Sequence, residues 1–440
     1  MNRFIQLVIA FSCLFSIARA QSVDSLVQEA LKNNSQVKAF DYQRDAAEYR
    51  AQALGTLPPP TFGIEFSQVP LSTGNVVNGA VSNNVSLSQM FMIGGKLSAM
   101  SEVERRRGAV IGQNGVSFQA QLRAKVKMTY YQLWLLDRQV EVQNGTLTLL
   151  GDLIQFMEPH VVTNRMRRAD LLTIQAEAAS ERARLQEQMS QRIGLVSGLN
   201  ALLARNDLST PIITESTLRV DRPRSSESIL AEQIKVANPQ LVSMDRMKDM
   251  NEAMIRSAQK DLIPDVMIQG MIMRMPNGMI LTGGTRSAEA IQQSAMGMPM
   301  QKTEWMYSIM ASVTLPFMPW SSARSSAKVE EMHATNLGID AEREAMQREM
   351  IASLREALAK FTTADSLVRQ YEAEILPLTK QSADAQTIAY QNGQVPVTTV
   401  LDARRMELMK QDDYLMVVMA RQMALVEMEL MVGSPILDKH

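Results

Sequence analysis

Hydrophobic and polar residues follow two different periods along this chain, and the changes of period predict its helices and strands. Residues 23–56 carry apolar side chains at helical spacing, and a run of three prolines ends the pattern. Residues 61–69 and 81–91 alternate with period two, which predicts strands. A long charged stretch from Lys96 to about Val162 predicts a helix, and a second helix is expected to return over about 170–204.

The same plan is then repeated. The segment from Asn34 to Pro60 resembles the segment from Asn238 to Pro264, and each ends a helix at proline before a short alternating stretch. Alternation returns over about 266–275 and about 305–317 and is followed by further long helical patterns. A duplicated unit of helix, two strands and helical hairpin is therefore expected. The expected divisions are a first repeat over 21–204, a linker over 205–225, a second repeat over 226–432 and a tail over 433–440.

The first twenty residues are typical of a signal peptide. Arg3 precedes an apolar stretch, and Ala18-Arg19-Ala20 fits the small-x-small cleavage pattern, so we expect the mature chain to begin at Gln21. Cys13 is the single cysteine and lies inside this segment, which leaves no thiolate for a disulfide or metal site in the mature chain. Whether Cys13 is ever lipidated stays open.

Charge and motifs argue against several classes of function. The net charge of −1 favours no nucleic-acid partner. The three histidines have no metal-binding spacing, and the sequence holds no nucleophile elbow, phosphate-binding loop or dinucleotide fingerprint. We therefore predict a protein that is not an enzyme and has no cofactor and no fixed metal site. No apolar run after the signal peptide is long enough for a transmembrane helix, so strands would have to cross any membrane as a closed barrel.

Each predicted strand has one apolar face. Strands of about ten residues suit a tilted crossing of the hydrocarbon layer. Four strands in one chain need partners on both edges, which a ring of several copies supplies, although a soluble sheet remains an alternative. The side chains predicted to face lipid are Phe62, Ile64, Phe66, Val85, Leu87, Trp305, Tyr307, Ile309, Val313 and Leu315.

Three short motifs carry a resemblance to a known family. They are YQNGQVPVTTVLDARR at 390–405, NPQL at 238–241 and LIPDV at 262–266. Together with the duplication, they resemble the TolC family of outer-membrane efflux proteins, and its heavy-metal resistance branch in particular. The resemblance implies a mainly α fold with a small β part. It also implies a homotrimer in the bacterial outer membrane, with a twelve-stranded β-barrel continued into the periplasm by an α-helical barrel.

The same resemblance implies partners and a gate. The partners would be a periplasmic adaptor (membrane fusion) protein, an inner-membrane RND-type pump and outer-membrane lipid. Asp402 matches the second of two inward acids at the family's helix tip, whereas Thr399 occupies the first place, so a paired acid ring is not expected. Gly393 and Asp170 belong to the predicted tips. The predicted adaptor-docking residues are Arg165, Arg167, Arg168, Asn392 and Gln394, with an ordinary basic turn as the alternative for the arginines.

The chain has 33 methionines, and many lie in the second pair of strands. There they alternate with aliphatic residues, so the methionines are predicted to face the lumen of the barrel. Thioethers suit Cu(I) or Ag(I), which suggests a soft-metal path. Methionine is also a flexible filler of apolar space, and this alternative stays open. The predicted lumen-facing methionines are Met267, Met271, Met273, Met275, Met306 and Met310.

The leading hypothesis is a passive, gated outer-membrane duct of a tripartite pump that exports small solutes, with Cu(I) or Ag(I) as one candidate cargo. A multidrug duct and a type I secretion duct are alternatives with the same fold. A soluble periplasmic coiled-coil scaffold is an alternative of another class.

Overall fold

The computed structural model describes residues 21–69, 71, 74–163, 167–218, 226–275, 303–434 and 436. The chain divides into two compact units, each built from segments that are distant in sequence. The first, here called the helical unit, comprises Met1–Tyr42, Gly112–Met244 and Glu342–His440. The second, here called the strand unit, comprises Gln43–Ile111 and Asp245–Ala341.

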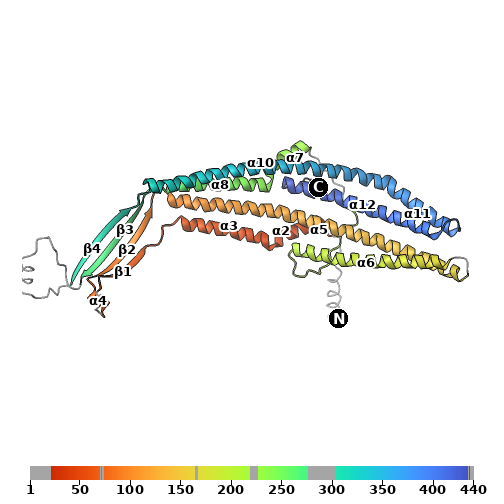
Figure 1. Cartoon of the computed structure of the whole chain (residues 1–440), viewed down its shortest axis with the longest axis horizontal. Coiled ribbons are helices and arrows are strands. Elements are labelled where there is room, and N and C mark those ends of the chain that lie inside the picture. Colours follow the sequence, from red (N-terminus) through yellow and green to blue (C-terminus); the bar gives the residue numbers. More distant parts are fainter. Residues whose placement is uncertain are drawn as a thin grey trace, which may run out of the picture. The chain divides into compact units, whose positions relative to one another are not determined.

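The strand unit contains a four-stranded antiparallel sheet in the order β1-β2-β3-β4 (Figure 1). The first repeat supplies β1 and β2, with the short helix α4 (Val76–Gly79) between them, and the second repeat supplies β3 and β4. The central pairing of β2 with β3 therefore joins the two repeats. The strand bounds are Thr61–Ser67 for β1, Ser82–Met92 for β2, Asp265–Met275 for β3 and Glu304–Val313 for β4.

Each repeat also has two helices before its strands and a long helical hairpin after them. In the first repeat these are α2 (Val23–Asn33), α3 (Ser35–Leu54), α5 (Lys96–Val162) and α6 (Arg168–Leu202). In the second they are α7 (Glu227–Ala237), α8 (Pro239–Lys260), α10 (Pro319–Gln370), a π-helical turn (Tyr371–Ile375), α11 (Leu376–Gln391) and α12 (Val397–Val432). The predicted fold class, mainly helical with a small sheet and an internal duplication, is confirmed.

Two asparagines show the duplication in its hydrogen bonds. Asn34 and Asn238 each end one helix and cap the next, because their side-chain oxygens accept the backbone N–H of Gln36 and of Gln240, both at 2.9 Å. Each side-chain Nδ2 then donates to a carbonyl near the end of a return helix: Asn34 to Leu202 at 3.5 Å and Asn238 to Met431 at 2.7 Å. The helix expected over 23–56 is therefore two helices with a break at Asn34.

The core of the helical unit repeats in the same way. In the first repeat, Leu26 and Ala30 of α2 pack in one buried cluster with Leu133 of α5 and Leu199 of α6. In the second repeat, Leu230 and Ile234 of α7 occupy a separate cluster with residues of α10 and α12, including Leu354 and Leu425. Each short helix thus buries its apolar stripe against the hairpin of its own repeat.

The last strand is shorter than its sequence pattern predicts. The ladder between β3 and β4 closes where the amide of Thr314 donates to the carbonyl of Asp265 at 3.0 Å. Pro316 has no N–H to continue a ladder, and α10 begins at Pro319. Leu315, predicted as a lipid-facing strand residue, therefore lies beyond the strand, where its side chain is exposed.

Candidate functional site

The register of the sheet assigns every strand residue to one of two faces, because residues directly opposite each other on neighbouring strands share a face. Ile64 lies opposite Val85, Val85 opposite Ile272, and Ile272 opposite Tyr307. One row of apolar side chains therefore crosses all four strands. The predicted lipid-facing residues that lie on strands all share this apolar face: Phe62, Ile64, Phe66, Val85, Leu87, Trp305, Tyr307, Ile309 and Val313.

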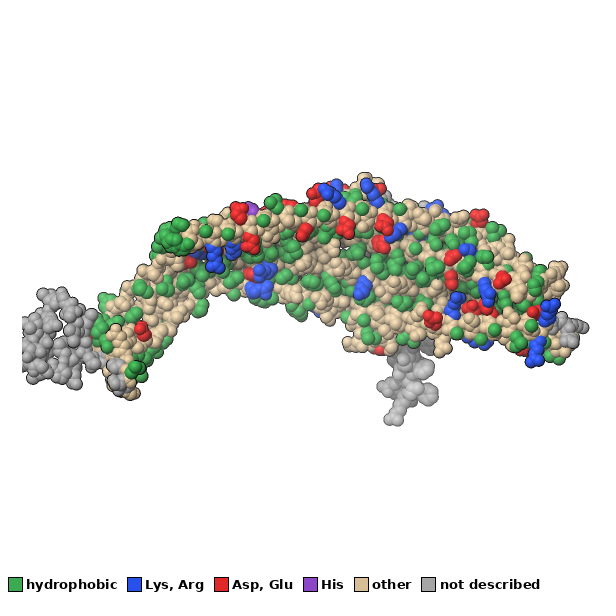
Figure 2. Space-filling view, in the orientation of Figure 1, with side chains coloured by type: hydrophobic (Ala, Val, Ile, Leu, Met, Phe, Trp, Pro, Cys, Tyr) green, Lys and Arg blue, Asp and Glu red, His purple; other side chains and the backbone are tan. Residues whose placement is uncertain are grey.

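The apolar face is exposed on all four strands. Ile64 is 61% exposed, Ile272 54% and Tyr307 82%. A water-soluble sheet would bury such a face against a core, and an exposed apolar surface of this extent indicates an interaction site. In the view of Figure 2 the sheet carries few charged side chains, whereas acidic and basic side chains are spread along the helices.

The opposite face, here called the methionine face, carries thioethers, hydroxyls and amides, with carboxylates at Glu65, Asp265 and Glu304. Met273 of β3 lies opposite Met306 of β4, and Met267 of β3 lies opposite Met90 of β2. Met90 is not among the predicted lumen-facing methionines, because only the pairing of β2 with β3 brings it beside Met267. All six methionines predicted to line a lumen lie on this face: Met267, Met271, Met273, Met275, Met306 and Met310.

The turn from β2 into α5 depends on two glycines. Gly94 and Gly95 have φ of 71° and 77°, a left-handed conformation that favours glycine. A Cβ on Gly94 would lie 2.5 Å from Cδ1 of Ile263, so the turn also requires a residue without a side chain at this position. Just beyond it, the ammonium of Lys96 pairs with the carboxylate of Asp265 at 2.8 Å, and both side chains are largely buried. These contacts link the start of α5 to the start of β3.

The second helical hairpin turns at Gly393. The amide of Gly393 donates to the carbonyl of Tyr390 at 2.9 Å, and the amide of Gln394 donates to that of Ala389 at 2.9 Å. With a φ of 72° at Gly393, this is a Schellman motif that satisfies the last carbonyls of α11. Asn392 and Gln394, on either side of the glycine, are exposed.

The tips of the two hairpins share a small core within the helical unit. Tyr390 is buried with Met157 of α5, Ile174 of α6 and Val400 of α12. Its hydroxyl donates to the sulfur of Met157 at 3.5 Å. Burial raises the pKa of Tyr390, and the nearby carboxylate of Asp170 raises it further. The predicted tip residues Gly393 and Asp170 therefore lie at one end of the helical unit.

A charged contact also joins the tips. Arg405 of α12 donates from Nε and Nη2 to the two carboxylate oxygens of Glu177 of α6, at 2.9 Å and 2.6 Å. These hydrogen bonds lower the pKa of Glu177. Asp402 lies one turn earlier on α12, with its side chain 75% exposed and 3.7 Å from Nη1 of the same Arg405. Thr399, in the first turn of α12, is half-buried.

The tip between α5 and α6 carries the predicted docking arginines. Arg167 is the N-cap of α6 and makes no side-chain capping hydrogen bond, and both Arg167 and Arg168 are exposed. Arg165, the third predicted docking arginine, lies outside the described residues. The structure thus leaves two guanidinium groups at this tip accessible to solvent.

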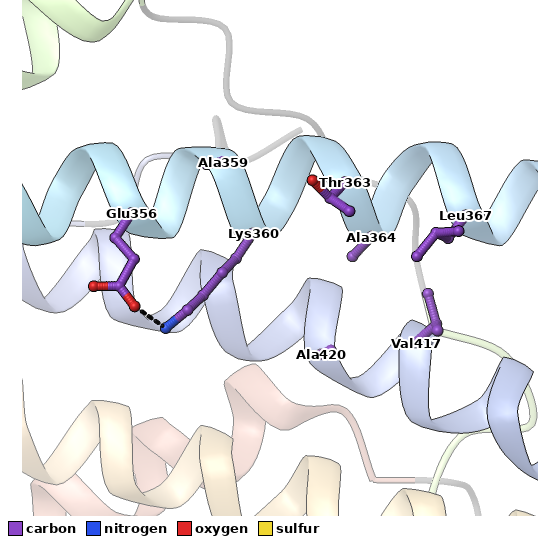
Figure 3. Close-up of a pocket in the computed structure, with 8 residues that line it drawn as sticks. All are labelled: Glu356, Ala359, Lys360, Thr363, Ala364, Leu367, Val417 and Ala420. Atoms are coloured by element: carbon purple, nitrogen blue, oxygen red, sulfur yellow. Dashed lines mark ion pairs between the residues drawn. The ribbon is translucent and has the colours of Figure 1, made fainter.

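An apolar groove lies between α10 and α12 in the helical unit (Figure 3). Its volume is 460 Å³, and the ion pair of Glu356 with Lys360 closes one end at 2.8 Å. Small side chains from both helices, among them Ala364 and Ala420, form the floor. Such a stripe of small residues is suited to close packing of another helix.

Two features are absent from the described residues. Within the ranges given above, no cluster of histidine, cysteine, aspartate and glutamate is arranged to hold a metal ion. Across the same ranges, no helix combines the length and the apolar character that a membrane crossing requires.

A four-stranded sheet combined with two long helical hairpins is the fold of a class of outer-membrane channels. The chain superposes on CusC, described as forming a transmembrane channel, with a TM-score of 0.71 at 16% identity over 96% of each chain. It superposes on the outer membrane protein VceC of Vibrio cholerae with a TM-score of 0.70 at 14% identity, over 94% of this chain and 96% of that one. For the open state of the MtrE outer membrane channel of Neisseria gonorrhoeae, the TM-score is 0.69 at 16% identity, over 94% and 89%.

The second repeat gives a match in sequence as well. Residues 230–434 match the model of the outer membrane efflux protein family. Together with the fold, this match confirms the resemblance to the outer membrane efflux proteins of TolC type that the sequence predicts. No curated protein sequence matches the chain. The family is one of transport channels rather than of enzymes.

Proposed function

We propose that this protein is the outer-membrane channel of a tripartite efflux pump. Three copies would close their twelve strands into one barrel in the outer membrane, and their helices would form a duct through the periplasm. The observation that carries the proposal is the exposed apolar face that runs across all four strands, from Ile64 through Val85 and Ile272 to Tyr307. Hydrocarbon is the environment in which such a face gains free energy.

The edges of the sheet support assembly from several copies. β1 and β4 each pair on one side only, so each leaves a row of backbone donors and acceptors without a strand partner in the sheet. In a membrane such groups need partners, and β4 of one copy can supply them to β1 of the next. A soluble periplasmic scaffold, the alternative of another class, would leave both the edges and the apolar face in water.

The tips of the hairpins are the proposed gate and docking surface. Asp402 is well placed as a gate acid, because it is exposed beside Arg405, and Arg405 in turn links α12 to α6 through Glu177. Thr399, Gly393 and Asp170 would complete the gate region. The exposed side chains proposed to meet a periplasmic adaptor are Arg167, Arg168, Asn392 and Gln394. Arg165, outside the described residues, stays a prediction.

The duct itself would be passive, with the energy supplied by an inner-membrane pump of RND type. Small solutes are the proposed cargo. Heavy-metal ions such as Cu(I) and Ag(I) are supported by the methionine face, and drug export or type I secretion would use the same duct.

The test begins with fractionation of cells that express the protein. The protein should sediment with the outer membrane, dissolve only in detergent, run as a trimer and form discrete conductance steps in planar lipid bilayers. Release by osmotic shock as a soluble, non-conducting protein would contradict the proposal.

A matched pair of substitutions on β4 tests which face meets lipid. Ile309 lies on the apolar face and Ser308, its neighbour, on the methionine face. Ile309→Asp should greatly reduce the amount of trimer in the outer membrane, because a carboxylate on the lipid side costs on the order of 1–3 kcal/mol per copy. Ser308→Asp should assemble normally and change only the ion selectivity of the conductance. Equal assembly of both variants would exclude the proposed orientation.

A further inference from the structure

Four methionines on β3 and β4 lie together on the methionine face, and we call Met271, Met273, Met306 and Met310 the methionine cluster. Met273 is directly opposite Met306, which places their Cβ atoms about 4.5–5.5 Å apart. Met271 is opposite Ser308 and is therefore diagonal to both Met306 and Met310, with separations of about 7–8 Å. Each thioether is thus within side-chain reach of at least one other.

The side chains around the cluster are polar but mostly uncharged. Across β2, Asn84 lies opposite Met273, and Ser86 lies opposite Met271. Asn84 is 7% exposed, and its Oδ1 has no hydrogen-bond partner among the described residues. Its Nδ2 donates to Glu65 of β1 at 3.4 Å. A buried acceptor of this kind costs free energy unless a ligand or water meets it.

The distribution of methionine favours a specific role over gap filling. Filler methionines occupy irregular gaps in cores. Met271, Met273 and Met306 are instead half-buried and Met310 is exposed, and none of them belongs to a buried cluster of the described residues. The same face of β1 has no methionine. On β2, Ser86 lies opposite Met271 and Ser88 opposite Gln269, and methionine appears only near the end of the strand, at Met90 and Met92.

We propose that the methionine cluster binds a soft monovalent cation, Ag(I) or Cu(I). Neutral, polarizable sulfur ligands select such ions over hard cations, which prefer oxygen. Three rotatable bonds in each side chain allow two or three sulfur atoms to converge on one ion. The proposal deepens the proposed function, since it rests on the methionine face lining the duct. Weak, neutral ligands in series would pass an ion along without trapping it.

The experiment compares two variants of the full-length protein purified in detergent. The cluster variant carries Met271→Leu, Met273→Leu, Met306→Leu and Met310→Leu. The control variant carries the same change at four exposed helical methionines, Met189, Met247, Met406 and Met416. Silver nitrate is titrated into each protein by calorimetry, and silver X-ray absorption reports sulfur neighbours.

We expect the cluster variant to lose at least one Ag(I) per protomer or at least tenfold in affinity, together with sulfur scattering, while the control variant behaves as the unchanged protein. Equal binding by all three proteins would overturn the proposal. If the cluster variant fails to assemble as a trimer, the smaller change Met273→Leu with Met306→Leu is measured in its place against Met406→Leu with Met416→Leu. Conductance in planar bilayers is recorded in parallel. Lost silver binding with normal conductance supports the cluster, whereas absent conductance in the unchanged protein contradicts only the channel.

Discussion

The two helical hairpins follow one plan, yet their tips are held by different means. Between α11 and α12, Gly393 adopts a left-handed conformation and its neighbours close a complete Schellman motif. Between α5 and α6, Arg167 is the N-cap of α6 and makes no side-chain capping hydrogen bond, and no residue described near this tip has a positive φ. The backbone of the second tip is therefore set by its own local sequence, whereas the described residues of the first tip show no comparable cap.

The long helices of the two repeats also differ in how regular they are. α5 passes Pro159, where a proline is expected to bend or end a helix, and stops three residues later at Val162. In the second repeat the helix widens into a π-helical turn over Tyr371–Ile375, directly before Pro377. Proline lacks the N–H that would bond four residues back, and a wider turn accommodates that loss. The second hairpin thus carries both the more irregular helix and the more self-sufficient tip.

The largest effect on this comparison is expected from Gly393→Val. A β-branched residue in the left-handed region costs about 1–2 kcal/mol or more, so the second tip should open locally. Hydrogen exchange of the Gln394 amide, which bonds to Ala389, should quicken by about tenfold or more. Gly194→Ala is the control, since this helical glycine of α6 has open space around its Cβ position and should become slightly more stable. Unchanged exchange at Gln394 would show that tertiary packing alone holds the tip.

Arg405→Met should have the next effect, because it removes the contact that ties the second tip to the first. Arg405 is largely exposed, so we expect a loss of about 1 kcal/mol or less. Distances between spin labels on α6 and α12, measured by pulsed EPR, should broaden. Arg348→Met is the control, because Arg348 makes a largely exposed pair within one helix. Identical distance distributions for Arg405→Met and the unchanged protein would contradict a link between the tips.

The same link should depend on pH in a defined direction. The folded pKa of Glu177 lies below its ordinary value of 4.5, so the pair stabilises the tip above that value and is lost as the pH falls through the lower, folded pKa. The label distances should therefore stay constant between pH 7 and about pH 5 and broaden only in stronger acid. In Arg405→Met, where the pair is already lost, the distances should be broad at neutral pH and should change little as the pH falls. Broadening that starts near neutral pH would assign the link to another group.

The smallest effect is expected from Asp402→Asn. Its carboxylate is exposed and 3.7 Å from Arg405, so stability should change by a few tenths of a kcal/mol. If Asp402 is a gate acid, cation selectivity in planar bilayers should nevertheless fall, whereas Asp384→Asn, which removes an acid paired with Arg404, should leave selectivity unchanged. Equal selectivity in both variants would remove Asp402 from the gate.

Local patterns in the sequence carried much of the fold, because helix and strand periods and proline stops are local properties. The duplication and the length of α5 could be read in this way. The break at Asn34 could not be predicted. A single asparagine inside a helical pattern can either cap a new helix or continue the old one, and the two differ too little in free energy for helix propensity to decide. The early end of β4 depends on where the ladder with β3 stops, which is a property of two strands rather than one.

The candidate sites, too, were predictable from the sequence only where a local pattern defines them. Alternation placed Met271 and Met273 on one face, but only the register showed that Met306 lies opposite Met273 and that Met90 lies opposite Met267. The contact between Arg405 and Glu177 joins residues from different repeats, and neither has a sequence signal for the other. Contacts between distant elements are therefore what the structure adds to the gate and to the methionine cluster.

The even number of strands in the sheet bears on how many copies can assemble into one ring. With four antiparallel strands, β1 and β4 run in opposite directions, so any number of copies can join edge to edge without breaking the alternation. Backbone pairing alone therefore does not determine whether two, three or four subunits assemble. The choice of three would have to be made where the copies meet through their helices, and small-residue surfaces such as the groove between α10 and α12 are where mutations could change the stoichiometry while sparing every strand.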